Sequence, residues 1–278
     1  MDMAMLVAIG LLTGATTVLF GFGGGFVAVP VVVWADTALG TDAIRVATAT
    51  SALVMLVNAA FATAVTPRRV LLALRGSGTL LPLLAAGACA GAYAARFAPA
   101  ALARWAFVLY VAVTVLDLLL RPGFLRTRTR PGTDRPARAD HRRPLPTTAG
   151  APIGALAAFL GVGGSVMTVP AMRRAGHPMS VATALANPLT LAIALPAATV
   201  SLAGSPLPVA ASHVDLVGLV DPWAAGALLL GALPVIAVLR RRPPHIPDRV
   251  HAWAYVGLLT VVALAMAVPD LAPTVGGV

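Results

Sequence analysis

Long apolar stretches, each about as long as a membrane is thick, dominate this chain. Residues 46–66, 103–120 and 179–203 are examples, and a helix that crosses a bilayer needs roughly 20 mainly apolar residues. Hydrophobic residues make up 59% and charged residues 11% of the 278, whereas a soluble domain averages about 25% charged residues. Such a chain cannot cover a water-facing surface of normal polarity. The sequence therefore predicts an all-α integral membrane protein with several transmembrane helices.

A glycine-rich block occurs twice. Residues 19–30 read LFGFGGGFVAVP and residues 159–170 read FLGVGGSVMTVP, so that three glycines, a valine and the final proline match at a constant offset of 140. Further on, the VATA of residues 46–49 returns at residues 181–184. Duplicated membrane units are typical of secondary transporters. We therefore expect two membrane repeats joined by a cytoplasmic linker rich in Arg and Pro, with the boundaries 1–120, 121–148 and 149–278.

Each repeat is expected to contain one segment broken by Gly and Pro, followed by three transmembrane helices. The broken segments cover about residues 3–35 and 149–172, with breaks at Gly23 to Gly25 and at Gly163-Gly164. The transmembrane helices are expected at about residues 46–66, 77–95, 103–120, 179–203, 217–239 and 251–269.

A family resemblance rests on these features together. The paired glycine blocks, each ending in a proline (Pro30 and Pro170), the Ala-Thr segments after them and the basic central linker resemble the sulfite exporter family of membrane permeases, also called TauE/SafE. The resemblance covers essentially the whole chain. It implies a multi-pass protein of the cell (plasma or inner) membrane. Its substrate would be a small anion, either a sulfur oxyanion such as sulfite or thiosulfate, or an organosulfonate.

Arginine placement predicts how the repeats are oriented, because cytoplasmic loops carry an excess of Lys and Arg. All 20 basic residues are Arg. If each repeat crossed the membrane four times, 11 arginines would be cytoplasmic and 9 external. If each Gly-broken segment is instead a re-entrant hairpin, the repeats are inverted and 17 arginines are cytoplasmic, with Arg45, Arg96 and Arg104 external. The sequence therefore favours two inverted repeats with three spans each.

The glycine blocks are candidate substrate-binding elements. Glycine takes positive φ at little cost and lets a ligand approach the backbone, and the N-terminus of a half-helix offers free N–H donors and a partial positive charge to an anion. Gly24 and Gly164 match in the repeat, so we expect alanine at either position to impair transport similarly. The alternative is close helix packing through small residues. The candidate residues are Gly23, Gly24, Gly25, Gly163, Gly164 and Ser165, whose hydroxyl would add a donor.

Polar residues at helical spacing follow each block. Their hydroxyl and amide groups can replace the water around an anion without a buried cation. Ser and Thr also join membrane helices structurally, so the two asparagines are the less ordinary members of the set. The predicted pathway residues are Thr48, Ser51 and Asn58 on one helix face, and Thr183 and Asn187 on another that also carries Thr190.

Ionisable residues lie at the edges of the apolar segments. Asp117 and Arg121 are four apart, which predicts an ion pair on one helix. Asp221-Pro222 has the pattern of an N-cap followed by proline at the first helical position. Arg45 is interpreted as a snorkelling anchor, with an anion-attracting gate as the alternative. The sequence shows no catalytic set, metal-binding spacing or cofactor motif, and the net charge of +10 lies in loops without the aromatic residues that stack on nucleic acids.

Two functions from different classes remain open at this point. The first is a permease that exports a small anion, which the negative potential of the cell interior expels without any intramembrane titratable pair. The second is a non-transporting membrane scaffold or assembly protein whose glycine blocks are packing surfaces. An intramembrane enzyme would need a nucleophile and a base that the sequence does not offer. Neither the exact substrate nor the oligomeric state follows from the sequence.

Overall fold

The described part of the chain is helical, with one isolated bridge between Val217 and Val220 as its extended structure. The computed structural model describes residues 3–35, 43–74, 78–121, 123–125, 147–203 and 216–267. The predicted all-α membrane fold is confirmed. The helices are α1 (Met3–Phe20), α2 (Gly25–Ala35), α3 (Ala43–Ala64), α4 (Arg68–Leu71), η2 (Leu72–Leu74), α5 (Leu80–Ala95), α6 (Ala100–Leu120), η3 (Thr147–Ala149), α7 (Gly150–Leu160), α8 (Ser165–Arg174), α9 (Met179–Leu202), α10 (Pro222–Arg241) and α11 (Asp248–Ala267).

Six described helices are long and apolar enough to cross a membrane: α1, α3, α6, α9, α10 and α11. The sequence also predicted six spans, but it assigned one of them to residues 77–95 and placed α1 inside a broken segment. The helix in that region, α5, has 16 residues, which corresponds to a length of about 24 Å. That is shorter than a hydrocarbon core of about 30 Å. Most of the predicted linker, Arg75 and residues 205–215 lie outside the described residues.

Glycines bring two pairs of helices into close contact. A Cβ atom added to Gly87 or Gly91 of α5 would overlap backbone oxygens of α7, and one added to Gly10 or Gly14 of α1 would overlap backbone oxygens of α10. Both pairs of glycines are four residues apart and therefore lie on one helix face. Small residues at this spacing let membrane helices approach until their backbones touch. The structure thus joins α1 to α10 and α5 to α7, always across the two predicted repeats.

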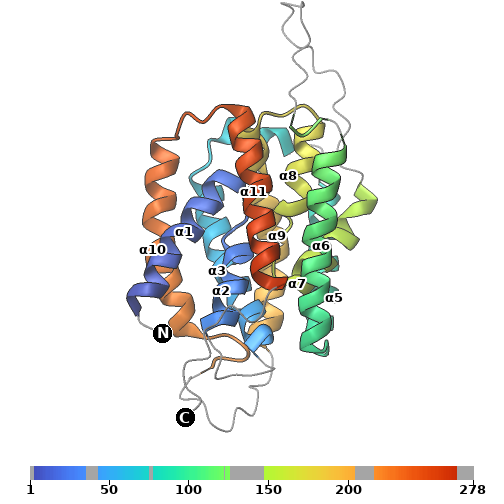
Figure 1. Ribbon diagram of the computed structural model, residues 1–278, viewed down its shortest axis with the longest axis vertical. Coiled ribbons are helices and arrows are strands. Elements are labelled where there is room, and N and C mark those ends of the chain that lie inside the picture. Colours follow the sequence, from blue (N-terminus) through green and yellow to red (C-terminus); the bar gives the residue numbers. More distant parts are fainter. Residues whose placement is uncertain are drawn as a thin grey trace, which may run out of the picture.

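The other helix contacts also come in corresponding pairs, one from each predicted repeat. α3 packs against α9 in the middle of the molecule, α5 packs against α9 as α10 does against α3, and α2 packs on α3 as α8 does on α9 (Figure 1). The apolar windows of α3 and α9 are 61% and 72% buried, against 28% for α6. The central pair therefore forms the core, while α6 lies at the lipid-facing periphery. Each contact has the counterpart that a duplicated unit predicts. The boundaries of the repeats and their inversion stay predictions.

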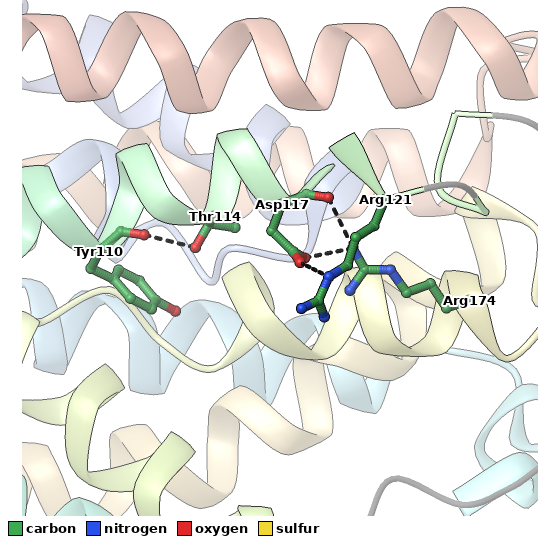
Figure 2. Close-up of polar contacts among 5 residues, drawn as sticks. All are labelled: Tyr110, Thr114, Asp117, Arg121 and Arg174. Carbon is green, nitrogen blue, oxygen red and sulfur yellow. Dashed lines mark hydrogen bonds and ion pairs between the residues drawn. The ribbon is translucent and has the colours of Figure 1, made fainter. Parts of the chain in front are cut away.

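Ion pairs fix one end of α8 to its neighbours. The predicted pair is confirmed, with Arg121 Nε 3.0 Å from Asp117 Oδ1, and Arg174 joins it at 2.5 Å from Asp117 Oδ2 (Figure 2). The preceding residue, Arg173, pairs with Asp248 at the start of α11. Two consecutive arginines thus tie the end of α8 to α6 and to α11.

The start of α10 has the predicted cap. The Asp221 carboxylate accepts a hydrogen bond of 3.0 Å from the Ala224 backbone N–H, and Pro222 occupies the first helical position. This satisfies one of the backbone donors that a helix leaves unpaired at its start.

Candidate functional site

Two glycine turns interrupt the chain between α1 and α2 and between α7 and α8. They comprise residues 21–24 and 161–164, because Gly25 and Ser165 are already the first residues of α2 and α8. The breaks therefore begin two residues earlier than the sequence predicted. Gly21 and Gly161 have φ of 76° and 68°, a backbone region that favours glycine. This explains why the first glycine of each block matches in the repeat.

The later glycines of the turns are only partly equivalent. Gly23 and Gly163 adopt nearly the same φ, 64° and 67°. Gly24 has φ of +89°, whereas Gly164 has φ of −77° and acts as the N-cap of α8. An ordinary residue tolerates the Gly164 backbone but not that of Gly24. The duplicated sequence predicted equivalent roles for these two glycines, and the structure gives them different backbones.

The two turns lie against each other in the core. A Cβ atom placed on Gly25 would lie 2.9 Å from the Gly161 carbonyl oxygen, and one placed on Gly163 would lie 3.5 Å from the Phe22 carbonyl oxygen. Met55 of α3 contacts the same positions on both turns. Two loops that are distant in sequence thus form one backbone-lined region, flanked by α3 and α9.

Each turn leads into the N-terminus of a short buried helix. No side chain caps α8. Its first residue, Ser165, is fully buried, and the Ser165 hydroxyl has no hydrogen-bond partner. Buried helix ends normally find side chains, water or a ligand for their free N–H groups. The α8 N-terminus therefore offers donors and a partial positive charge at the point where the two turns meet.

Asn58 on α3 is the most exceptional side chain near the turns. It is fully buried, and neither its amide nitrogen nor its amide oxygen has a hydrogen-bond partner. Its Nδ2 atom would lie 2.7 Å from a Cβ atom placed on Gly24, so the amide lies directly beside the first turn. Leaving a buried polar group unpaired costs about 1–3 kcal/mol. Such a group in a native structure calls for an explanation, such as a water or ion that it binds.

The other predicted residues of α3 lie at the second turn. Ser51 Oγ donates to the Gly161 carbonyl oxygen at 3.2 Å, and Thr48 Cγ2 would lie 2.9 Å from a Cβ atom placed on Gly161. Ser51 and Thr48 are therefore in contact with the second turn, and their role in lining the substrate pathway stays a prediction. Their described contacts also support packing, because the carbonyl oxygens of Gly161 and Thr48 share the single hydroxyl proton of Ser51.

The predicted residues of α9 lie along the first turn. The Thr183 carbonyl oxygen would be 2.7 Å from a Cβ atom placed on Gly21. Asn187 is fully buried, donates from Nδ2 to that same Thr183 oxygen at 3.3 Å, and has no partner for its Oδ1 atom. Thr190, also fully buried with an unpaired hydroxyl, contacts Gly23 and Gly163 through its methyl group.

Three residues at the turns were missed by the sequence reasoning. Met55 contacts both turns, and it lies between Ser51 and Asn58 on the predicted face of α3, so helical spacing would have found it. Thr13 and Thr17 of α1 contact Gly24, with Thr17 Oγ1 3.6 Å from the added Cβ position. These threonines precede the glycine block within an apolar stretch, where nothing in the sequence distinguishes them from residues that face lipid.

Two cavities lie toward opposite ends of α6, with residues close in sequence to the second turn in their linings. The first, here called the arginine cavity, has a volume of about 30 Å³ and lies among α3, α5, α7 and α9, with Arg45, Arg96 and Thr48 in its lining. The second, here called the α6–α8 cavity, has a volume of about 490 Å³ and extends from Asp117 and Arg174 (Figure 2) to residues 166–167, which follow the turn.

Comparison with protein families identifies the chain. A family model described as sulfite exporter TauE/SafE matches residues 6–266. The chain belongs to this family. No curated protein and no solved structure is significantly similar to it. Membership of the TauE/SafE family confirms the resemblance found in the duplicated glycine blocks and makes the protein a membrane transporter rather than a member of an enzyme family. Within this TauE/SafE protein, the paired turns with Asn58 and Asn187 form the candidate substrate site.

Proposed function

We propose that this protein is a permease that moves a small anion, a sulfur oxyanion or an organosulfonate, out of the cell across the plasma or inner membrane. The anion would bind where the two glycine turns meet. The backbone N–H groups of the turns and the amide and hydroxyl groups of α3 and α9 would replace its hydration shell. No buried cation is needed, because charge-assisted hydrogen bonds to an anion are about twice as strong as neutral ones.

The observation that carries this proposal is the unpaired amide of Asn58 beside Gly24. A scaffold protein would gain nothing from a fully buried amide without partners, since an apolar residue of similar shape would be more stable there. Thr190, whose hydroxyl is unpaired, contacts both turns, and Asn187, whose Oδ1 is unpaired, donates to the Thr183 oxygen beside Gly21. Several costly groups concentrated at one place support a site that binds a polar ligand.

The inverted arrangement of the repeats is part of the proposal. In support, Arg104 contacts the C-terminal end of α11, whereas Arg173 pairs with Asp248 at its N-terminal end. These contacts put an arginine predicted to be external at one end of α11 and one predicted to be cytoplasmic at the other. Whatever the orientation of the protein, the negative cell interior would favour efflux of an anion by about 2.3 kcal/mol per charge per 100 mV.

Transport is tested directly in proteoliposomes with radiolabelled sulfite, thiosulfate and an alkanesulfonate. We expect saturable flux of at least one of these anions, with a rate that increases when a potential pulls negative charge across the membrane. Empty liposomes and liposomes with the Asn58→Leu variant are the controls. A flux no faster than that of empty liposomes for every anion, from protein shown to be folded, would refute the permease.

Orientation is tested separately by single-cysteine labelling in cells on a Cys89→Ser background. We expect a membrane-impermeant reagent added outside to label Ala210→Cys and to leave Arg241→Cys unlabelled. The opposite pattern, with strong labelling at 241 and silence at 210, contradicts the inversion without deciding the substrate.

A further inference from the structure

The α6–α8 cavity has apolar walls and one charged end. Its lining on α6, α7 and α8 is mainly aliphatic, and the hydroxyl of Thr114, which also lines it, already donates to the Tyr110 carbonyl oxygen at 2.8 Å. Asp117 and Arg174 form the charged end (Figure 2). The cavity therefore suits a molecule with a long apolar part and a polar group at one end.

The cavity opens on a surface that faces lipid. Val113 on α6, Pro152 on α7 and Met167 on α8 line it and are also exposed at the surface of the protein. Because α6 is a candidate membrane span at the periphery of the molecule, acyl chains surround an apolar opening beside it. The volume of about 490 Å³ lies within the range of roughly 300–1,000 Å³ that is usual for pockets that hold organic ligands.

The depth of the cavity matches one leaflet of a bilayer. On α8 the lining extends from Arg174, the last residue of the helix, to Val166, its second residue. Eight residues of helix correspond to about 12 Å, and half of a hydrocarbon core of about 30 Å is about 15 Å. An acyl chain that starts at the charged end would thus reach almost to the middle of the membrane.

The charged end carries an excess of positive charge. Arg121 Nε and Arg174 Nη2 both pair with the Asp117 carboxylate, at 3.0 and 2.5 Å. Two guanidinium groups on one carboxylate leave a net charge of about +1 among the described residues at this end. The Arg121 side chain is also 74% exposed, so its guanidinium group remains accessible to a group at the membrane surface.

We propose that the α6–α8 cavity binds an anionic phospholipid, with one acyl chain among α6, α7 and α8 and the phosphate at Arg121 and Arg174. Guanidinium groups match the geometry of phosphate oxygens, and the apolar walls bury a chain that water would not solvate. Both arginines are predicted to be cytoplasmic, where the leaflet is rich in anionic lipids. The choice of leaflet rests on the proposed orientation, whereas the site itself rests on the cavity and its charges.

Photo-crosslinking in nanodiscs locates the lipid without changing the protein. Phosphatidylglycerol and phosphatidylcholine, each with a diazirine in one acyl chain, are compared, and the adducts are mapped by mass spectrometry. At Met167 we expect about fivefold more adducts from phosphatidylglycerol, which is the factor that one basic residue contributes near a membrane surface. At Leu230, an exposed apolar residue of α10 outside the cavity, the two lipids should react equally.

Matched variants separate the headgroup contact from the acyl-chain contact. Arg121→Gln removes the excess charge and keeps the pair of Arg174 with Asp117, so the preference for phosphatidylglycerol should disappear. The double variant Val113→Phe/Ile153→Phe fills the cavity, so adducts of both lipids at Met167 should fall. Arg69→Gln removes an exposed arginine of α4 that is also predicted to be cytoplasmic but lies outside the cavity, and it should change neither result.

Thermal unfolding distinguishes a bound lipid from a bound free anion. A ligand that binds the folded protein raises its thermal midpoint. In detergent, phosphatidylglycerol should raise the midpoint of the parent protein more than phosphatidylcholine does, and this difference should be lost in Arg121→Gln. Inorganic phosphate has no chain for the apolar walls, and we expect it to leave the midpoint unchanged.

Four outcomes would overturn the lipid site. They are equal adducts of the two lipids at Met167, an equal loss of preference in Arg69→Gln, adducts that persist when the cavity is filled, and stabilisation by inorganic phosphate as large as that by phosphatidylglycerol. None of these measurements depends on transport. Adducts that follow the expected pattern in a protein that moves no anion would support the lipid site and refute only the permease.

Discussion

The two glycine turns have matching backbones at their first and third residues and different surroundings at their fourth. The position beside Gly24 is polar, with Asn58, Thr13 and Thr17 in contact. The position beside Gly164 is occupied by Ile193, whose Cδ1 atom would lie 2.5 Å from an added Cβ. Asn58 and Ile193 occupy equivalent positions in the two predicted repeats, because Asn58 follows Val46 by 12 residues and Ile193 follows the matching Val181 by 12 residues.

This difference indicates that the duplicated glycine blocks determine the backbone shape of the turns, whereas the side chains of the flanking helices determine which groups a ligand could contact. Both turns place a helix N-terminus in the core, but only the first has an unpaired amide beside its fourth residue. An anion held between them would therefore contact side chains mainly at the first turn and backbone mainly at the second. Three predictions test this asymmetry.

The largest effect is expected from Asn58→Leu. Losing the amide removes hydrogen bonds to a charged ligand, worth about 1.5–3 kcal/mol, so transport should fall roughly 10- to 100-fold. The folded protein should at the same time become more stable, because an unpaired buried polar group is replaced by an apolar one of similar shape. Flux normalised to folded protein and the thermal midpoint in detergent measure the two effects.

The counterpart substitution sharpens the test. Ile193→Asn puts an amide at the second turn and should destabilise the protein by about 1–3 kcal/mol, with transport per folded protein within about threefold of the parent. Ile193→Leu is the conservative control. If Asn58→Leu lowers stability and flux together, Asn58 has a structural role and the two turns do not differ in function.

An intermediate effect is expected from Gly24→Ala. At φ of +89° an alanine is strained by about 1–2 kcal/mol, and its methyl group would meet the Asn58 amide at 2.7 Å. Transport should fall at least about tenfold. Gly164→Ala has an ordinary backbone and meets only the flexible end of Ile193, so a change within about threefold is expected. Equal losses in both variants would contradict the asymmetry and restore the equivalence that the repeat suggests.

The smallest and most symmetric effect is expected from Gly23→Ala and Gly163→Ala. Both glycines have positive φ, and added Cβ atoms would lie 2.9 and 3.1 Å from the same atom, Thr190 Cγ2. We expect similar losses of roughly fivefold. Thr190→Ser removes that methyl and should partly restore either variant. A loss confined to one of the two, measured as flux per folded protein, would show that the turns differ even where their geometry matches.

Much of this architecture is predictable from the sequence. The length of the apolar stretches predicted the membrane fold, and the glycine blocks predicted the turns. Local spacing predicted the ion pair of Asp117 and the helix cap of Asp221. These are local features, set by residues a few positions apart. Helical spacing also puts Ser51 and Asn58 on one side of α3, where both are buried, and the role of this face in transport stays a prediction.

The remainder depends on contacts between distant segments. The sequence does not reveal that Gly164 has an ordinary negative φ, because this angle depends on how α8 packs. Ser51 was expected to face the substrate, yet it is hydrogen-bonded to Gly161, 110 residues away. The predicted span at 77–95 was also too long, because α5 begins at Leu80, after the polar residues 77–79, and so has 16 residues. Pairings of α1 with α10 and of α5 with α7 follow from complementary glycine faces, which many helices in this chain could present.

The pairing of α1 with α10 has a consequence for biogenesis. The first helix leaves the ribosome roughly 200 residues before its partner, which at about 5–20 residues per second is a delay of roughly 10–40 s. During that interval the face of α1 that carries Gly10 and Gly14 has only lipid, the insertion machinery or chaperones in place of α10. Assembly is therefore completed only near the end of translation, so a truncated chain that lacks the last two helices would be an early target for membrane proteolysis.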